Sequence, residues 1–330
     1  MLNKNPARLL SRGVFYCLLF LNHKLYATEI SPFATRDQNP LVMIFGLPVA
    51  TPANIVKNDE SYFITSINIS NTINRQQTGN EFLFVDAESY QLNLMYEKGL
   101  SDKWMLRIQI PLIGHSGGFL DSWIDGYHDT LGLPEDIRPL YPRDQLSIRY
   151  DNGGNTLLDV QESTSGLGDI AFQFARQVET SNDFALSYWA SIKLPTGDSS
   201  KLTGSDSTDL SLWIASHTRV SEVTALYGNL GILFMSNSKI LKQQQKNTAV
   251  FAVAGIQYQA WQSVLLKAQI DAHSALYKTD MDFMGNVIQF TFGGTILMQN
   301  HTSLDIAVAE DIDSGTSPDV NFNFTLRTQF

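Results

Sequence analysis

The sequence predicts an all-β fold, an antiparallel up-and-down transmembrane β-barrel of about twelve strands with a short helix in a long extracellular loop. Segments of strand length recur along the chain, and most are near the roughly 9–11 residues that cross a bilayer at a tilt. The connections between them alternate between short and long, as in outer-membrane barrels. No apolar run approaches the roughly 20 residues of a membrane helix, so a chain that crosses a membrane must do so as a closed barrel.

The first 27 residues have the pattern of a secretory signal peptide. Basic residues at 4, 8 and 12 precede an apolar core at 13–21, and Leu25-Tyr26-Ala27 forms an acceptable cleavage site. A buried helix is the alternative interpretation of this stretch. We expect export through the Sec pathway and residence in the bacterial outer membrane.

The mature chain is expected to be acidic and free of cysteine. Loss of residues 1–27 lowers the basic count from 23 to 19 against 33 acids, a net charge of −14. Such a charge disfavours nucleic acid, whose binding requires a basic surface, and suits loops that meet divalent cations and lipopolysaccharide. The one cysteine, Cys17, lies in the signal segment, so we expect neither disulfides nor a thiol nucleophile.

Residues 28–59 contain four prolines, so neither a long helix nor a central strand fits them. Residues 41–50 are nevertheless strongly apolar and need a partner surface. Two interpretations stay open. The segment either plugs the lumen or lies against the periplasmic rim of the barrel, or it is a partly ordered leader arm.

We expect the barrel to occupy residues 60–330. The predicted strands are 60–71, 82–98, 103–112, 166–178, 183–194, 208–219, 224–236, 248–259, 263–274, 285–298, 302–311 and 319–330. An even count places both termini in the periplasm. A soluble β-sandwich is the alternative fold, since its strands alternate in the same way.

Alternation along the predicted strands assigns several charged side chains to the lumen, because charges facing lipid at mid-depth would cost about 2–4 kcal/mol. These lumen residues are Arg107, Lys267, Asp271, Asp305 and Arg327. Residues 302–311 and 319–330 should be antiparallel neighbours. We therefore expect Asp305 and Arg327 to lie close enough to pair.

The long extracellular loop, residues 113–165, contains a candidate helix near 119–131. Aromatic and apolar residues recur there every four positions at Phe119, Trp123, Tyr127 and Leu131, and aspartates recur at Asp121, Asp125 and Asp129. We expect the aromatic side chains to turn toward the barrel mouth and Asp121 and Asp125 to face solvent. The helix either covers the mouth by packing or gates an entry path. In the second case Trp123→Ala should raise conductance, provided the lumen is otherwise open.

The last strand ends the chain on an aromatic residue. Residues 320–330 alternate without a break, and Phe330 lies on the apolar face. This ending resembles the closing strand of bacterial outer-membrane barrels, whose terminal aromatic is read by the assembly machinery. The resemblance implies that Phe330 is an assembly signal and that its deletion lowers the folded fraction in outer membranes.

Further motifs carry a family resemblance over nearly the whole mature chain. The segments are Asn39-Pro40-Leu41, Gly46-Leu47-Pro48, Gly118-Phe119-Leu120-Asp121, His128-Asp129 and Gly132-Leu133-Pro134. They resemble a domain-of-unknown-function family of proteobacterial outer-membrane proteins. Two more, Gly166-Leu167-Gly168-Asp169 and Leu194-Pro195-Thr196-Gly197-Asp198, are similar to the barrel family of the phenol-degradation meta pathway. Both resemblances imply fold and location, and neither implies an activity.

We expect no catalytic residues, no metal site and no cofactor. No two histidines of the mature chain have metal-ligand spacing on one element, and Asp271 and His273 on one lumen face indicate a hydrogen-bond network. The leading hypothesis is therefore passive passage of a small solute, with an apolar solute as the candidate partner beside lipid, lipopolysaccharide and the assembly machinery. The alternatives are a non-conducting surface structural or interaction protein and an outer-membrane lipid hydrolase.

Overall fold

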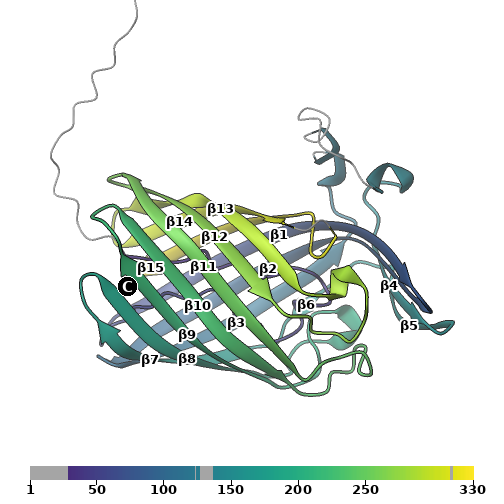
Figure 1. Cartoon of the computed structure of the whole chain (residues 1–330), viewed down its shortest axis with the longest axis horizontal. Coiled ribbons are helices and arrows are strands. Elements are labelled where there is room, and N and C mark those ends of the chain that lie inside the picture. Colours follow the sequence, from purple (N-terminus) through teal and green to yellow (C-terminus); the bar gives the residue numbers. More distant parts are fainter. Residues whose placement is uncertain (1–28, 123, 127–136, 313–314) are drawn as a thin grey trace, which may run out of the picture.

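The protein is a closed antiparallel barrel of twelve strands (Figure 1). The computed structural model describes residues 29–122, 124–126, 137–312 and 315–330. The wall consists of β1 (Ser61–Thr78), β2 (Glu81–Ser101), β3 (Trp104–Ser116), β6 (Thr164–Leu167) continued by β7 (Ala171–Thr180), β8 (Phe184–Lys193), β9 (Asp209–Arg219), β10 (Thr224–Met235), β11 (Thr248–Trp261), β12 (Val264–His273), β13 (Val287–Met298), β14 (Thr302–Asp311) and β15 (Val320–Gln329). Pairing of β15 with β1 closes the ring. No helix in the described part of the chain is long and apolar enough to cross a membrane.

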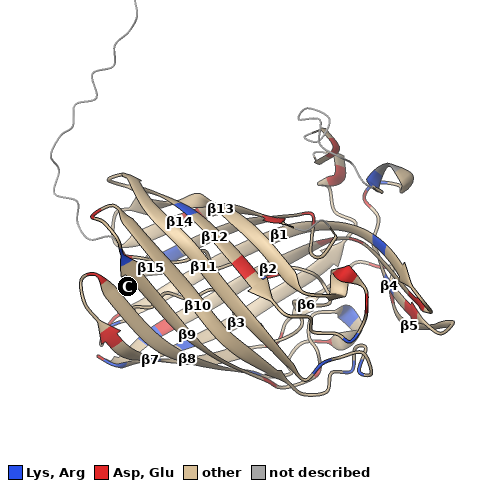
Figure 2. Ribbon diagram, viewed as in Figure 1, with Lys and Arg blue, Asp and Glu red and all other residues tan. Residues whose placement is uncertain are grey.

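The outer face of the wall is apolar, and its inner face carries both polar and apolar side chains. On β9 the outward side chains of Leu210, Leu212 and Ile214 are 39–42% exposed, whereas Ser211 and Trp213 between them are at most 3% exposed. Charged residues are sparse along the middle of the strands and gather toward the two ends (Figure 2). A wall with this polarity is built to face lipid, so the sandwich alternative is wrong.

The two ends of the barrel differ in their connections. The turn end carries the short connections and the C-terminus, and the loop end carries the longer ones (Figure 1). Glu29 also lies at the turn end, where it binds Arg327 near the end of β15. Aromatic side chains beside the short turns, Tyr96, Trp104, Tyr258 and Trp261, are 36–66% exposed. By the rule that short turns are periplasmic, the turn end faces the periplasm and the loop end faces the outside.

At the loop end the predicted connection at 72–81 is wrong. β1 and β2 instead run on beyond the barrel and join through a tight turn at Gly79, where φ is +57°. A hairpin within the long loop, β4 (Ser147–Asn152) and β5 (Asn155–Val160), pairs with this extension of β2. Leu83, Val85 and Ile148 are fully buried there, so the extension is part of the apolar core of the protein. That core explains why the strands do not stop at the membrane.

The N-terminal part of the described chain lies inside the barrel. Residues 29–56, which we call the inner segment, are almost all buried. The side chains of Leu41, Ile44 and Phe45 are at most 1% exposed and join a core that includes inward residues such as Trp189 and Trp213. The apolar core of the protein is therefore the contact between the inner segment, the wall and the loops at the loop end.

Candidate functional site

The inner segment is held in the lumen by side-chain amides of the wall. The Phe33 N–H donates to the Gln269 side chain at 3.0 Å, and the Gln269 amide donates back to the Phe33 carbonyl at 3.3 Å. Asn229 makes the same two bonds with the backbone of Thr51, at 2.7 and 3.0 Å. A segment broken by prolines cannot pair as a strand, and a buried backbone needs partners. The wall supplies these partners through polar lumen side chains.

One arginine fixes the shape of the inner segment. The Arg36 guanidinium donates to the carbonyls of Met43, Phe45 and Leu47 at 2.8, 3.2 and 2.6 Å. The Arg36 side chain is buried, and the inner segment folds back on itself around it. The planar guanidinium can donate to several acceptors at once.

The predicted lumen residues Asp271 and His273 both bind the inner segment. The Thr35 hydroxyl donates to the Asp271 carboxylate at 3.0 Å, and His273 Nε2 lies 3.0 Å from the Asp37 carboxylate. Both side chains therefore face inward on β12, and Asp271 also accepts hydrogen bonds from Gln269 and Thr291 of the wall. Sequence reasoning did not foresee these partners, since residues 35 and 37 lie 236 positions away.

A buried ion cluster ties the inner segment to the loop at 195–207. Lys193 Nζ lies 2.5 Å from the Asp169 carboxylate, 3.2 Å from that of Asp209 and 2.5 Å from the Ser205 hydroxyl, and it donates to the Ile44 carbonyl at 3.1 Å. Sequence reasoning missed this cluster. Its signal was a lysine on a lumen face directly before the Leu194-Pro195 turn.

The cluster also explains the two motifs at 166–169 and 194–198. Asp169 ends the Gly-Leu-Gly-Asp motif, and its second carboxylate oxygen accepts the Gly197 N–H of the Leu-Pro-Thr-Gly-Asp motif at 2.8 Å. A Cβ at Gly197 would approach the Gly204 backbone to 2.8 Å, so only glycine fits there. The motifs are thus structural, because they close the loop over Lys193.

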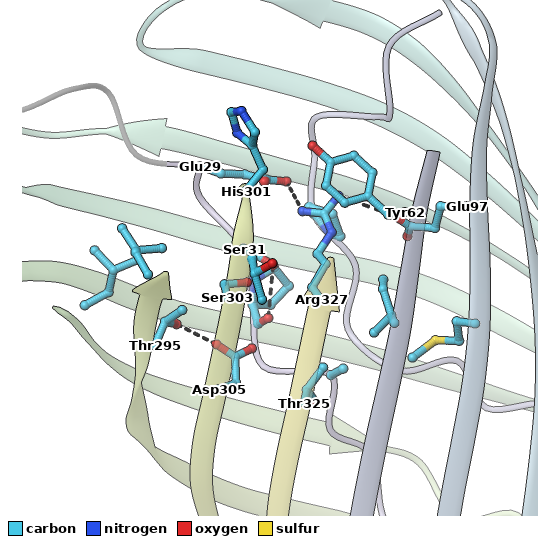
Figure 3. A pocket seen from close by; sticks show the side chains of 18 of the residues that line it. Glu29, Ser31, Tyr62, Glu97, Thr295, His301, Ser303, Asp305, Thr325 and Arg327 are labelled. Carbon is cyan, nitrogen blue, oxygen red and sulfur yellow. Dashed lines mark hydrogen bonds and ion pairs between the residues drawn. The ribbon is translucent and has the colours of Figure 1, made fainter. Parts of the chain in front are cut away.

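A cavity of about 540 Å³ lies at the turn end, between the inner segment and β1, β2 and β12–β15 (Figure 3). One part of its wall is apolar and includes Leu265, Leu297 and Met95. The other part is charged, with Arg327 at its centre. The cavity therefore combines apolar surface with a few polar groups, as small-molecule sites do.

The charged part of the cavity is a chain of ion pairs. The Arg327 guanidinium binds the Glu29 carboxylate of the inner segment and lies 3.3 Å from the Glu97 carboxylate of β2. Glu97 is in turn held by Arg107 at 2.5 Å. The Arg327 guanidinium also lies over the Tyr62 ring, 3.9 Å from its centroid, which restricts its position (Figure 3).

The predicted pair between Asp305 and Arg327 is wrong, although both side chains lie on the lumen face. The register of β14 and β15 places Asp305 opposite Thr325 and places Arg327 opposite Ser303, so the two charges are offset along the strands. Asp305 pairs instead with Lys267 at 3.1 Å.

The predicted orientation of the loop helix is also wrong where it can be seen. The described residues among 121–126 are helical, but Asp121 is buried and binds Arg138 at 2.8 Å. Phe119 is 63% exposed, because its N–H is held by the Glu88 carboxylate at 2.8 Å in a turn that directs the side chain outward. Asp125 pairs with Arg143 at 2.7 Å. Trp123 and Tyr127 lie outside the described residues.

Phe330 lies at the seam that closes the barrel. Its ring is 70% exposed and stacks on Tyr96, with centroids 6.2 Å apart, and its N–H donates to the Ser61 carbonyl at 3.1 Å. The residue thus extends the pairing of β15 with β1 by one bond and adds an aromatic ring at the turn end.

A serine–histidine contact inside the wall was not foreseen. Ser89 Oγ lies 2.8 Å from His115 Nδ1, and His115 Nε2 faces the Leu202 carbonyl at 3.2 Å. Both side chains are at most 2% exposed. The contact therefore links β2, β3 and the loop at 195–207, and its geometry is that of a structural hydrogen bond.

Comparison with known proteins agrees with this architecture. The COG4313 outer membrane channel from Pseudomonas putida F1 has 13% identity and a TM-score of 0.56, over 84% of this chain and 98% of that one. The KdgM porin in complex with oligogalacturonate has 5% identity and a TM-score of 0.43, over 82% and 98%. The P. putida toluene transporter TodX has 9% identity and a TM-score of 0.39, over 84% and 92%. No curated protein matches the sequence.

The first of these structures shares the barrel fold. A closed barrel with an apolar outer face is a protein of the bacterial outer membrane. The family profile described as "Protein of unknown function (DUF3187)" matches residues 10–330. The protein belongs to the DUF3187 family.

Proposed function

We propose that the protein allows passive passage of a small, partly apolar solute across the outer membrane, and that the inner segment closes the path at rest. The cavity at the turn end is the observation that supports this proposal. Its volume, about 540 Å³, lies within the usual range of small-molecule sites, roughly 300–1,000 Å³. It faces the periplasmic half of the lumen, where a solute in transit would be held.

The path beyond the cavity is closed by two elements. The inner segment fills the lumen, and the loop between β12 and β13 lies over it at the loop end, where the Tyr277 hydroxyl donates to the Leu41 carbonyl at 2.7 Å. Phe283 and Met281 of the same loop are at most 1% exposed. Passage therefore requires the inner segment to move. Its backbone is held by side-chain hydrogen bonds, each worth about 0.5–1.5 kcal/mol net, which a transient rearrangement can exchange.

The filled lumen also favours a second candidate, a non-conducting surface protein. In that case the inner segment is a permanent core that replaces water inside the barrel. The two candidates differ in one respect, which is whether movement of the inner segment opens a path.

A disulfide that pins the inner segment separates them. An ideal Cβ at Gly46 would lie 2.9 Å from the Cβ of Asp209, so a Gly46→Cys/Asp209→Cys pair needs a shift of about 1 Å to reach disulfide geometry. The solutes are phenyl glucoside and 4-carboxyphenyl glucoside, which do not cross lipid unaided. Entry of either into proteoliposomes is expected for the natural chain and the reduced variant, and no entry for the oxidised variant. Exclusion of both solutes by all three proteins would establish the non-conducting alternative.

A further inference from the structure

We propose that the cavity at the turn end is a carboxylate site whose anion is supplied at rest by the protein itself, through Glu29. The inference rests on the proposed function and names its solute class, a small monocarboxylate with an apolar body. Arg327 would bind the carboxylate of the solute, and the inner segment would release Glu29 from Arg327 in exchange.

The charges of the wall show an excess of one cation at this site. Arg107 and Arg327 are positive and Glu97 is negative, and the pair of Lys267 and Asp305 is neutral. Glu97 is already held by Arg107 at 2.5 Å, while its distance to Arg327 is 3.3 Å. The positive charge of Arg327 is therefore balanced in full only when Glu29 is present. A buried charge without a partner is costly, so the site requires an anion.

Glu29 is suited to be an exchangeable anion. Its side chain is 43% exposed, whereas that of Arg327 is 13% exposed. It belongs to the inner segment and not to the wall, so it leaves when the start of that segment moves. The close-up shows its carboxylate reaching Arg327 from the side of the inner segment, above the cavity (Figure 3). An external carboxylate can make the same charge-assisted bonds.

The surroundings of Arg327 define the rest of the ligand. The Nε of Arg327 is buried and has no hydrogen-bond partner among the residues that the structure describes. An incoming carboxylate would therefore bind at Nη1, the atom that Glu29 occupies at rest. The Tyr62 ring holds the guanidinium plane, and Leu265, Leu297 and Met95 form the apolar wall. A short aromatic or branched carboxylate matches this combination, whereas a purely apolar solute would offer Arg327 no hydrogen-bond acceptor.

Binding can be measured separately from passage, with two fluorinated probes that differ in charge. 4-Fluorobenzoate and its neutral isostere 4-fluorobenzamide would be titrated by ¹⁹F NMR against the folded protein in detergent micelles. Glu29→Gln should tighten 4-fluorobenzoate by about tenfold, since the competing carboxylate is gone, and leave 4-fluorobenzamide within about twofold. Asp59→Asn, which removes one exposed acid of the same rim, is the matched control and should change neither affinity.

Arg327→Gln should abolish 4-fluorobenzoate binding, and a heat-induced gel shift verifies that this variant is folded. Equal affinity for the two probes, or no tightening with Glu29→Gln, would overturn the inference. If that result came with entry of phenyl glucoside, the proposed passage would stand and only the solute class would be wrong. Selective binding of 4-fluorobenzoate without passage in any form would support the site and refute the proposed passage.

Discussion

At the scale of single residues, the charges inside this barrel are paired between elements that are far apart in the sequence. Lys193 of β8 holds Asp209 of β9 and Asp169, which lies between β6 and β7, and Arg36 balances the acid in excess from inside the lumen. Each ion thus stabilises the contact between two elements. Such pairs contribute register and position more than net free energy, because desolvation offsets most of the Coulombic gain.

Removing one member of such a cluster has a different effect from removing a surface charge. Lys193→Met removes the cation that contacts two buried carboxylates, and the free energy of unfolding should fall by about 3–5 kcal/mol. Lys239→Met is the control, since Lys239 pairs with Asp206 at 2.9 Å with its side chain 76% exposed, and it should leave stability unchanged. Urea titrations of folding in lipid vesicles measure both, and similar stability of the two variants would contradict the role given to Lys193.

The lumen face of each charged residue could be predicted from alternation, but its partner could not. Arg327 and Asp305 lie on the predicted face, because the period of two is a local property of the strand. Their partners depend on strand register and on the path of the inner segment, and neither has a sequence period. Asp121 is a second example. The helical pattern predicted that its side chain is exposed, whereas the side chain is buried in an ion pair with Arg138.

At the scale of elements, the inner segment is irregular in backbone yet fixed in position. Its prolines lack the backbone N–H groups that a strand would need for pairing. Its backbone instead forms hydrogen bonds with the side chains of Gln269, Asn229 and the buried Arg36. Composition indicated a segment that needs a partner surface, and the structure places that surface inside the barrel. The hairpin of β4 and β5 was not predicted, because each of its strands has only six residues.

Arg36 should control the mobility of this element. Arg36→Met removes the donors to three buried carbonyls, each of which costs about 1–3 kcal/mol when left unpaired. Amides of residues 41–47 should then exchange with deuterium faster, while those of β8–β11 keep their protection. Arg36→Lys is the control, because it keeps the charge without the planar fork and should give an intermediate rate. Unchanged exchange at 41–47 in Arg36→Met would show that packing alone holds the segment.

At the scale of the whole molecule, the barrel has an apolar outer surface where it meets the membrane and polar side chains in its interior. Its lipid face carries leucine, isoleucine and phenylalanine, and its lumen carries amides, hydroxyls and paired charges. The strand count and nearly all strand positions followed from the sequence, because a two-sided wall of this length repeats one pattern. The predicted strand at 302–311 coincides with β14, for example.

The depth of a residue in this wall should set the effect of a charge. Leu230, in the middle of β10, is 59% exposed, and Leu100, beside a turn, is 53% exposed. In vesicles, Leu230→Arg should lower the free energy of unfolding by about 2–4 kcal/mol, and Leu100→Arg should lower it by about 0–1 kcal/mol. Equal losses in the two variants would mean that the apolar belt is not where the structure places it.

The position of the inner segment also sets an order of events during assembly. Ser61 follows the segment almost directly and begins β1, and β1 forms the closing seam with β15. The segment contacts β7, β12 and β15 through residue pairs more than 120 positions apart. A ring that closed first would have to be threaded by a proline-rich chain, past side chains already in place. The seam between β1 and β15 must therefore close around the inner segment, as the last step of assembly. Folding that depends on contacts between residues far apart in the sequence is slow.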